Sequence, residues 1–234
     1  MAFGFDGIRR RLQAWLDKAH SRALDAKIKL AKRNIVRQSA GDSVVAAELE
    51  SIDQEARWRY RQLLYSHVGQ ALCVWSAMED TLVAIASMLL RTDVTKSGLV
   101  MYSIINFSVW LNLIDELFPL EPAYMPLKPR WNKLNERLRA LKDTRDRLAH
   151  HIAHTRDDID FPEDSTSLRP GRYDTRRKSQ KYQPLTRKQI EAFTGAVAEV
   201  NEDLGALITA MAALVERGTS PQKSSEQDSG QHPP

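Results

Sequence analysis

Residues 186–218 read TRKQIEAFTGAVAEVNEDLGALITAMAALVERG, and this stretch decides the fold class. Its apolar residues recur at steps of three and four, the period of a helix with one buried face. These residues are Ile190, Phe193, Val197, Val200, Leu204, Leu207, Met211 and Leu214. Thr186 and Gln189 form a capping box, and Gly218 is typical of a helix end. The stretch therefore predicts a long helix within a helical bundle.

The same spacing recurs along most of the chain, and little of the sequence alternates with period two. We therefore predict an all-α fold. The four further predicted helices cover about 5–38, 43–91, 96–118 and 129–154. A cluster of prolines stops the third of them, and the charged segment 156–184 is predicted to be a long loop. Residues 219–234, rich in Ser, Gln and Pro, are predicted to be a disordered tail.

Length and composition limit the class of protein. With 234 residues the chain is too short for two full-sized domains. Its content of 42% hydrophobic and 27% charged residues is close to the globular average, which argues against wholesale disorder and against a polytopic membrane protein. Cys73 is the single cysteine, so a disulfide framework within one chain is excluded and a reducing compartment such as the cytoplasm is favoured.

The net charge of +4 hides two strongly basic segments. Residues 1–41 carry a net charge of +7, residues 165–188 carry another +7, and the rest of the chain sums to −10. Such segregation is typical of a protein that binds a polyanion, either nucleic acid or an anionic membrane surface. Charge alone does not decide between the two.

No segment is predicted to enter a membrane. The first residues interleave apolar and charged side chains and form no secretory signal. The most membrane-like stretch, 98–114, contains Asn and Ser residues and runs into Asp115 and Glu116, so it favours a buried core helix. We therefore expect a soluble, cytoplasmic protein.

Two predicted apolar stripes are each interrupted by one charge. The inward positions are Leu134, Leu138, Leu141, Arg145, Leu148 and Ile152 in one helix, and Val68, Leu72, Trp75, Glu79, Leu82, Ala86 and Leu89 in the other. A buried charge needs a partner, so Arg145 and Glu79 are predicted to face each other. The pair is either part of a site or a salt bridge that fixes the helix register.

Arg145 stands beside further polar residues. Asp146 and His150 are four apart on the predicted helix, so the carboxylate can orient the imidazole by a hydrogen bond. Arg145 and His150 lie about 140° apart around the helix axis. An oriented histidine with a nearby arginine supplies a general acid or base and a cation for a phosphate, without a metal ion.

At these residues the chain resembles the HEPN superfamily (higher eukaryotes and prokaryotes nucleotide-binding domains). Arg145, Asp146 and His150 match the family signature of an Arg, a polar residue, three further residues and a His. The segment 74–79 looks like the first core helix of that fold, where an acidic residue, here Glu79, supports the arginine. The resemblance spans about 57–154 and implies a four-helix up-and-down bundle, which the last helix completes. The commonest family form has Asn at the place of Asp146.

The resemblance implies a metal-independent endoribonuclease of a toxin–antitoxin system or of anti-phage defence, active as a homodimer and without a cofactor. His150 would activate the ribose 2′-hydroxyl or protonate the leaving 5′-oxygen, and Arg145 would stabilise the charge on the phosphate. Asp146 would hold His150, and the product would be a 2′,3′-cyclic phosphate. Other family members are inactive RNA-binding, nucleotide-binding or scaffold modules, and this is the alternative function.

Two other chemistries fit these residues less well. Asp146, His150 and His154 fall on one predicted helical stripe, but three ligands on one straight helix seldom converge on an ion, so no metal site is predicted. Cys73 stands next to a stripe position without any motif, so it is predicted to pack in the core and not to act as a nucleophile.

Aromatic and basic residues mix at two places. Trp58 and Tyr60 are flanked by Arg57, Arg59 and Arg61, a pattern that suits stacking on bases or packing on a neighbouring helix. In the predicted loop, basic residues with spaced tyrosines suit single-stranded RNA, with a solvated surface as the alternative. The predicted RNA-binding residues are Arg169, Arg172, Tyr173, Arg176, Arg177, Lys178, Lys181 and Tyr182.

The organisation predicted from the sequence has three parts. Residues 1–41 form a basic amphipathic helical extension, in which 1–37 contact an anionic membrane, the chain's own bundle, or an antitoxin or defence-system protein. Residues 43–217 form the HEPN-like bundle, with a core of 57–155 and 185–217. The tail follows.

Overall fold

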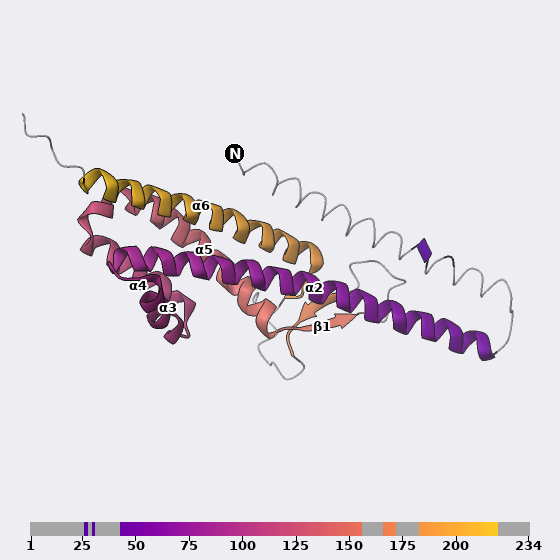
Figure 1. Cartoon of the computed structure of the whole chain (residues 1–234). Helices are drawn as coiled ribbons and strands as arrows, with labels where there is room; N and C mark the ends of the chain where they lie inside the picture. The colour runs from indigo at the N-terminus through magenta and orange to yellow at the C-terminus, as the bar shows by residue number, and fades with distance from the viewer. Residues whose placement is uncertain (1–25, 28–29, 31–42, 156–165, 172–182, 220–234) are drawn as a thin grey trace, which may run out of the picture. The chain divides into compact units, whose positions relative to one another are not determined.

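The computed structural model of the chain describes residues 26–27, 30, 43–155, 166–171 and 183–219 (Figure 1). Its elements are α2 (Ser43–Leu89), α3 (Val94–Ser103), α4 (Phe107–Leu117), η1 (Phe118–Leu120), η2 (Pro122–Leu127), α5 (Lys128–His150), β1 (Ile152–Thr155), β2 (Thr166–Arg169), β3 (Leu185–Thr186) and α6 (Arg187–Thr219). The described chain is mostly helical, which confirms the all-α prediction, with a small sheet that the sequence did not predict. Of the predicted tail 219–234, Thr219 is the last residue of α6 and the rest lies outside the described residues. Almost all of the predicted amino-terminal helix also lies outside them; Ala26, Lys27 and Leu30 are helical.

The chain divides into two compact units. The motif unit comprises the described residues of Met1–Leu72 and Thr144–Phe193, and the bundle unit comprises those of Cys73–Asp143 and Thr194–Pro234. The long helices α2, α5 and α6 each contribute residues to both units.

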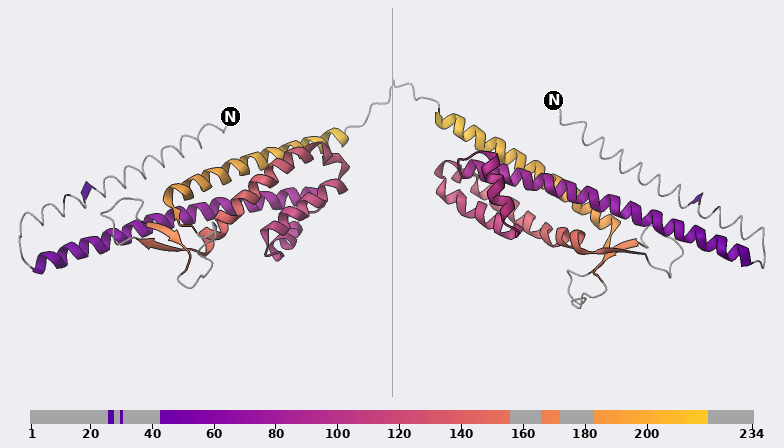
Figure 2. Two further views of the ribbon diagram at one scale, coloured as in Figure 1. Left: turned by 180° about the vertical axis from the view of Figure 1, so that it is seen from behind. Right: turned by 60° about the horizontal axis from the view of Figure 1, so that its bottom comes forward.

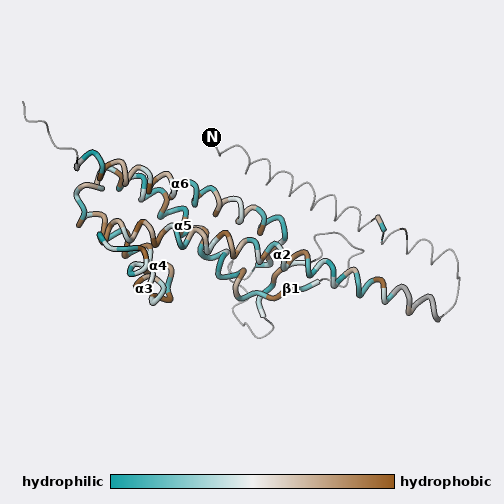
Figure 3. The backbone as a smooth tube through the Cα atoms, viewed as in Figure 1, coloured by the Kyte–Doolittle hydropathy of each residue, from teal (hydrophilic) through white to brown (hydrophobic). Residues whose placement is uncertain are grey.

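Three helices run side by side in the bundle unit (Figures 1 and 2). Thr81 of α2 donates a hydrogen bond to Asn201 of α6 at 2.7 Å, and Arg137 of α5 donates to Asp203 of α6 at 2.6 Å. Hydrophobic and hydrophilic residues alternate along α5 and α6, as one-sided burial requires (Figure 3). Of the eight predicted stripe residues of α6 only Leu214 is not buried, so this stripe is confirmed.

The predicted single helix 96–118 is wrong, because the chain breaks between α3 and α4. The Asn106 side chain accepts a hydrogen bond from the Ser108 backbone at 2.9 Å and so starts α4. Trp110 Nε1 donates to the Ile104 carbonyl at 2.9 Å, which satisfies a backbone group at the break. The uncharged stretch 98–114 is therefore divided between two short helices.

The predicted helix 129–154 ends early, at His150, and the predicted loop 156–184 contains a strand. β1 pairs with β2 in antiparallel register, with Ile152 opposite Arg169 and Thr155 opposite Thr166, and β2 pairs with β3. The two threonine hydroxyls lie 3.2 Å apart and are buried. β-branched residues and this cross-strand pair favour the strand over another helical turn.

The capping box at the start of α6 is confirmed. The Thr186 backbone N–H donates to Gln189 Oε1 at 2.9 Å, and the Gln189 backbone N–H reaches Thr186 Oγ1 at 3.4 Å. β3 ends at Thr186 and α6 begins at Arg187, so the capping box starts the helix directly after the last strand of the sheet.

One segment of α2, Glu50–Leu89, is long and apolar enough to cross a membrane by length and composition. Core helices of soluble proteins meet the same criterion, and 44% of its most apolar part is buried within the fold.

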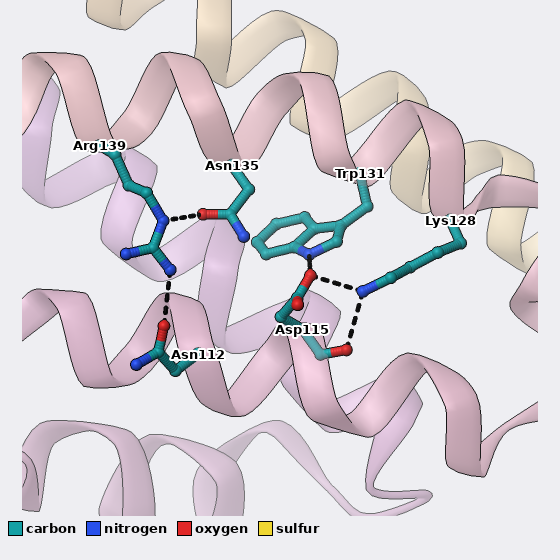
Figure 4. A network of polar contacts seen from close by, with 6 residues as sticks. All are labelled: Asn112, Asp115, Lys128, Trp131, Asn135 and Arg139. Atoms are coloured by element: carbon teal, nitrogen blue, oxygen red, sulfur yellow. Dashed lines mark hydrogen bonds and ion pairs between the residues drawn. The ribbon is translucent and has the colours of Figure 1, made fainter.

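A polar network joins α4 to α5 in the bundle unit (Figure 4). Asp115 Oδ1 accepts hydrogen bonds from Lys128 Nζ at 2.5 Å and from Trp131 Nε1 at 3.0 Å. Arg139 donates to Asn135 at 2.9 Å and to Asn112 at 2.6 Å. Burial acts to raise the pKa of Asp115, but the hydrogen bonds from Lys128 and Trp131 and the charge of Lys128 outweigh it and hold this pKa below its ordinary value of 3.8.

Asp115 should make the stability of the protein pH-dependent in acid. Since its pKa is lower in the folded than in the unfolded chain, the stabilisation is complete above the unfolded pKa of about 4 and is lost as the pH falls through the folded value. We expect Asp115→Asn to lower the free energy of unfolding by about 1 kcal/mol at pH 7. The difference from wild type should shrink between pH 5 and pH 3, as measured by urea unfolding. An equal difference at pH 7 and pH 3 would contradict the charged role of Asp115.

Candidate functional site

The predicted motif lies in the last turns of α5, within the motif unit. Arg145 Nη1 lies 3.4 Å from Asp146 Oδ1, and both side chains are partly exposed. The Arg145 Nε is buried and has no hydrogen-bond acceptor among the described residues. His150 is the last residue of α5 and is exposed. The hydrogen bond between Asp146 and His150 stays a prediction.

The strand that follows changes the place of two predicted residues. His154 lies on β1 and not on the stripe of Asp146 and His150, so the helical arrangement weighed for a metal is wrong. Ile152 is 54% exposed and is not an inward helical position. Among the described residues no group of three His, Cys, Asp or Glu side chains is arranged to hold a metal ion.

The motif helix also holds one end of the predicted RNA-binding segment. Arg147 Nη2 donates to the carbonyl oxygens of Gln183 at 2.5 Å and Pro184 at 3.4 Å. Arg169 ends β2, where its Nε lies 3.4 Å from Ser167 Oγ. The other predicted RNA-binding residues lie outside the described residues; they are Arg172, Tyr173, Arg176, Arg177, Lys178, Lys181 and Tyr182.

Glu79 lies on α2 in the bundle unit. Its Oε1 accepts a hydrogen bond from Trp75 Nε1 at 2.7 Å. Nearby, Tyr102 of α3 donates to Asp80 at 2.7 Å; burial, this hydrogen bond and the charges of Asp80 and Glu79 raise the pKa of Tyr102 to about 12. The pairing of Glu79 with Arg145 stays a prediction.

The predicted stripe on α2 is right in the bundle unit and displaced in the motif unit. Trp75, Leu82, Ala86 and Leu89 are buried, but Val68 and Leu72 are only partly so. In the motif unit, the buried face of α2 consists of Ala56, Tyr60, Leu64, His67 and Ala71.

His67 is a buried polar residue of the motif unit that the sequence reasoning missed. It is buried, and its Nε2 lies 3.6 Å from Glu191 Oε1 of α6, which also lies 3.3 Å from Arg187 Nε. The signal was available: His67 stands at steps of three and four between Leu64 and Ala71, so it interrupts an apolar stripe just as Arg145 does.

The burial of the aromatic residues and of the single cysteine agrees with the predictions only in part. Trp75 and Trp110 are buried, as expected of core residues. Cys73 is exposed, so the prediction that it packs in the core is wrong: it precedes the buried Met78 by five residues and lies on the other face of α2. Tyr60 is buried while Trp58 is exposed, so the two aromatic residues do not share one surface.

The residues at the end of α5 have the chemical types that acid–base cleavage of RNA needs. An exposed imidazole can exchange protons with a ribose hydroxyl, and a guanidinium two turns or less away can bind a phosphate. The fold alone identifies no family: comparisons with protein families, with curated proteins and with solved structures find no match to this chain.

Proposed function

We propose that this chain is a metal-independent endoribonuclease of the HEPN type that acts in toxin–antitoxin biology or anti-phage defence. The observation that carries the proposal is the end of α5, where Arg145, Asp146 and the exposed His150 stand within six residues. In the proposed scheme it works in the cytoplasm as a homodimer, with an antitoxin or another defence protein as a further partner.

The proposed reaction is an attack within the RNA chain. The ribose 2′-oxygen bonds to phosphorus as the bond from phosphorus to the 5′-oxygen breaks, leaving a 2′,3′-cyclic phosphate and a 5′-hydroxyl. His150 takes the proton of the 2′-hydroxyl or gives one to the 5′-oxygen. Arg145 binds the phosphate oxygens through its partly exposed guanidinium. Asp146 orients His150 or Arg145.

The basic segment after the motif supports RNA as the substrate. β2 ends at Arg169, and β3 begins at Leu185 beside it in the sheet, so the segment between them leaves and returns at one place. Arg147 of the motif helix binds the carbonyl of Gln183 near its return. Both ends of the predicted RNA-binding segment, at Arg169 and Gln183, therefore belong to the same unit as the motif.

Cleavage of single-stranded RNA in excess EDTA tests the function. We expect the purified protein to cleave, and the products to carry 2′,3′-cyclic phosphate and 5′-hydroxyl ends. A requirement for a divalent metal, or products with 5′-phosphate ends, would contradict the proposal. Tight binding without cleavage would instead favour the inactive HEPN-like RNA-binding, nucleotide-binding or scaffold protein.

A further inference from the structure

Apolar side chains lie along the outer side of the corner that α3 and α4 form beside α2 in the bundle unit (Figures 1 and 2). The inner side of α3 is buried at Ser97 and Met101, which are both 0% exposed. Leu99 stands two residues from each of them, so it lies on the opposite side of the helix, and it is 72% exposed. α3 therefore packs with one face and presents a large aliphatic side chain on the other.

Five exposed apolar residues form what we call the corner face: Leu99, Val100, Tyr102, Ile105 and Val109. Leu99 and Tyr102 are neighbours on α3, three residues apart. The Tyr102 ring meets the ring of Trp110 edge-on at 5.1 Å between centroids, which brings the end of α3 against the start of α4 next to Val109. Ile105 stands in the break between the two helices and is fully exposed. The five residues thus form one connected area around the break.

The area of the corner face matches one side of a stable protein–protein interface. A large apolar residue presents on the order of 150–200 Å² when fully exposed, so the exposed fractions of the five amount to roughly 500–600 Å². Each partner of a standard-size interface contributes about 800 Å², of which about 60% is apolar. The corner face supplies the apolar part of such an interface, and exposed polar residues around it, such as Ser103 and Asn106, supply a rim.

No charge stands within the corner face. Residues 97–114 contain no Asp, Glu, Lys, Arg or His. The carboxylates of Glu79 and Asp80 lie at its edge, where Asp80 accepts the hydrogen bond of the Tyr102 hydroxyl at 2.7 Å. Lys96, in the first turn of α3, is in an ion pair at 3.0 Å with the carboxylate that caps this helix. Because this cation is paired, the face offers little attraction to RNA or to an anionic membrane.

A second copy of the chain is the occupant that suits an uncharged apolar face. A two-fold contact brings a patch onto itself, so each charge near its centre would meet its own copy. Homodimer interfaces are accordingly more apolar than those of transient complexes. Tyr102 adds a large ring at low entropic cost, because Trp110 and Asp80 already hold it in place.

We propose that two copies of this chain associate through the corner face about a two-fold axis, with Leu99, Tyr102 and Ile105 of each copy at the centre of the contact. This surface serves the homodimer of the proposed function. Association through it does not depend on the chemistry at His150, so it holds whether or not the chain cleaves RNA.

Sedimentation velocity of the full chain over a series of concentrations tests the corner face. At about 10 μM the wild type should sediment as a dimer of the 26.6 kDa chain, since interfaces of this size commonly have micromolar or lower dissociation constants. Leu99→Glu/Ile105→Glu should raise the dissociation constant at least about 100-fold, because like charges then face each other across the axis. Ile105→Glu alone replaces a fully exposed side chain, so it cannot disturb the fold, and it should raise the constant about tenfold.

Leu120→Glu is the matched control. Leu120 is 71% exposed, almost as much as Leu99, and it lies beyond the other end of α4, about 16 Å of helix away from the break. This variant should dimerise like the wild type. Far-ultraviolet circular dichroism and the melting temperature should be the same in all the variants, since each replaced side chain is exposed.

The outcomes separate the corner face from the proposed function. A wild type that stays monomeric at about 100 μM overturns the corner face, and so does a dimer that the double variant leaves intact. An equal loss of dimer in Leu120→Glu overturns it as well. Binding of a monomeric wild type, but not of the double variant, to vesicles of phosphatidylcholine and phosphatidylserine assigns the face to a membrane and also overturns it. Absence of RNA cleavage by a dimeric wild type overturns the proposed function alone.

Discussion

His150→Ala should abolish RNA cleavage while the protein remains folded. Removal of a general acid or base lowers a rate by about 100- to 10,000-fold, and this is the expected loss in single-turnover cleavage. The imidazole is exposed at the last residue of α5, so its removal opens no cavity. Far-ultraviolet circular dichroism and the melting temperature should therefore match those of the wild type.

His154→Ala provides the matched control for this prediction. His154 is also an exposed histidine, four residues further along and on β1, where it has no place in the proposed chemistry. Its replacement should leave the rate within about twofold of the wild type. Cleavage at the wild-type rate by the His150→Ala variant would contradict the catalytic role of His150. Equal losses of activity in both variants would show that the two substitutions act by disturbing the end of α5 and β1.

Trp131→Ala should be among the most destabilising single substitutions in the bundle unit. Trp131 is 0% exposed, its ring stacks on Phe118 at 5.8 Å between centroids, and its Nε1 donates to Asp115. The substitution leaves a large cavity and removes a hydrogen bond to a carboxylate. We expect a loss of about 3–5 kcal/mol in the free energy of unfolding, measured in urea.

A second variant of Trp131 separates the parts of this loss, and a variant of an exposed tryptophan serves as the control. Trp131→Phe keeps most of the ring but loses the hydrogen bond to Asp115, so it should cost about 1–2 kcal/mol. Trp58→Ala removes an exposed ring and should change the free energy of unfolding by less than about 0.5 kcal/mol. If Trp58→Ala were as destabilising as Trp131→Ala, the described burial of α2 and α5 would be wrong.

The long helices were predictable because their burial is one-sided and periodic. In α6 the steps of three and four continue for eight residues, and the cap at Thr186 stands where the hydrogen bonds begin. The strand β1 was not predictable, because Ile152 continues the spacing of the preceding apolar residues and no Pro or Gly marks the end of α5. Pairing with the distant β2 decides its conformation, and a local pattern carries no information about that pairing.

The candidate site was predictable only in part. Arg145 was predicted because a charge in an apolar stripe stands out. The same reasoning applies to His67, but it was missed because the predicted stripe of α2 began at Val68, one residue away from the face that is buried. Exposure of Trp58 beside the buried Tyr60 depends on which face of α2 meets a neighbour. Sequence periodicity defines a face, but packing decides which of two adjacent faces is covered.

The three-stranded sheet has a consequence for the two segments that connect its strands. The segments 156–165 and 172–182 each leave from one paired strand and return to the next, with Thr155 opposite Thr166 and Leu168 opposite Leu185. Strand pairing holds both ends of each segment, and the cost of closing a loop rises only slowly with its length. Under the proposed function, replacing the residues between Arg169 and Gln183 with a different segment should therefore change which RNA is bound while the pairing of the three strands is kept.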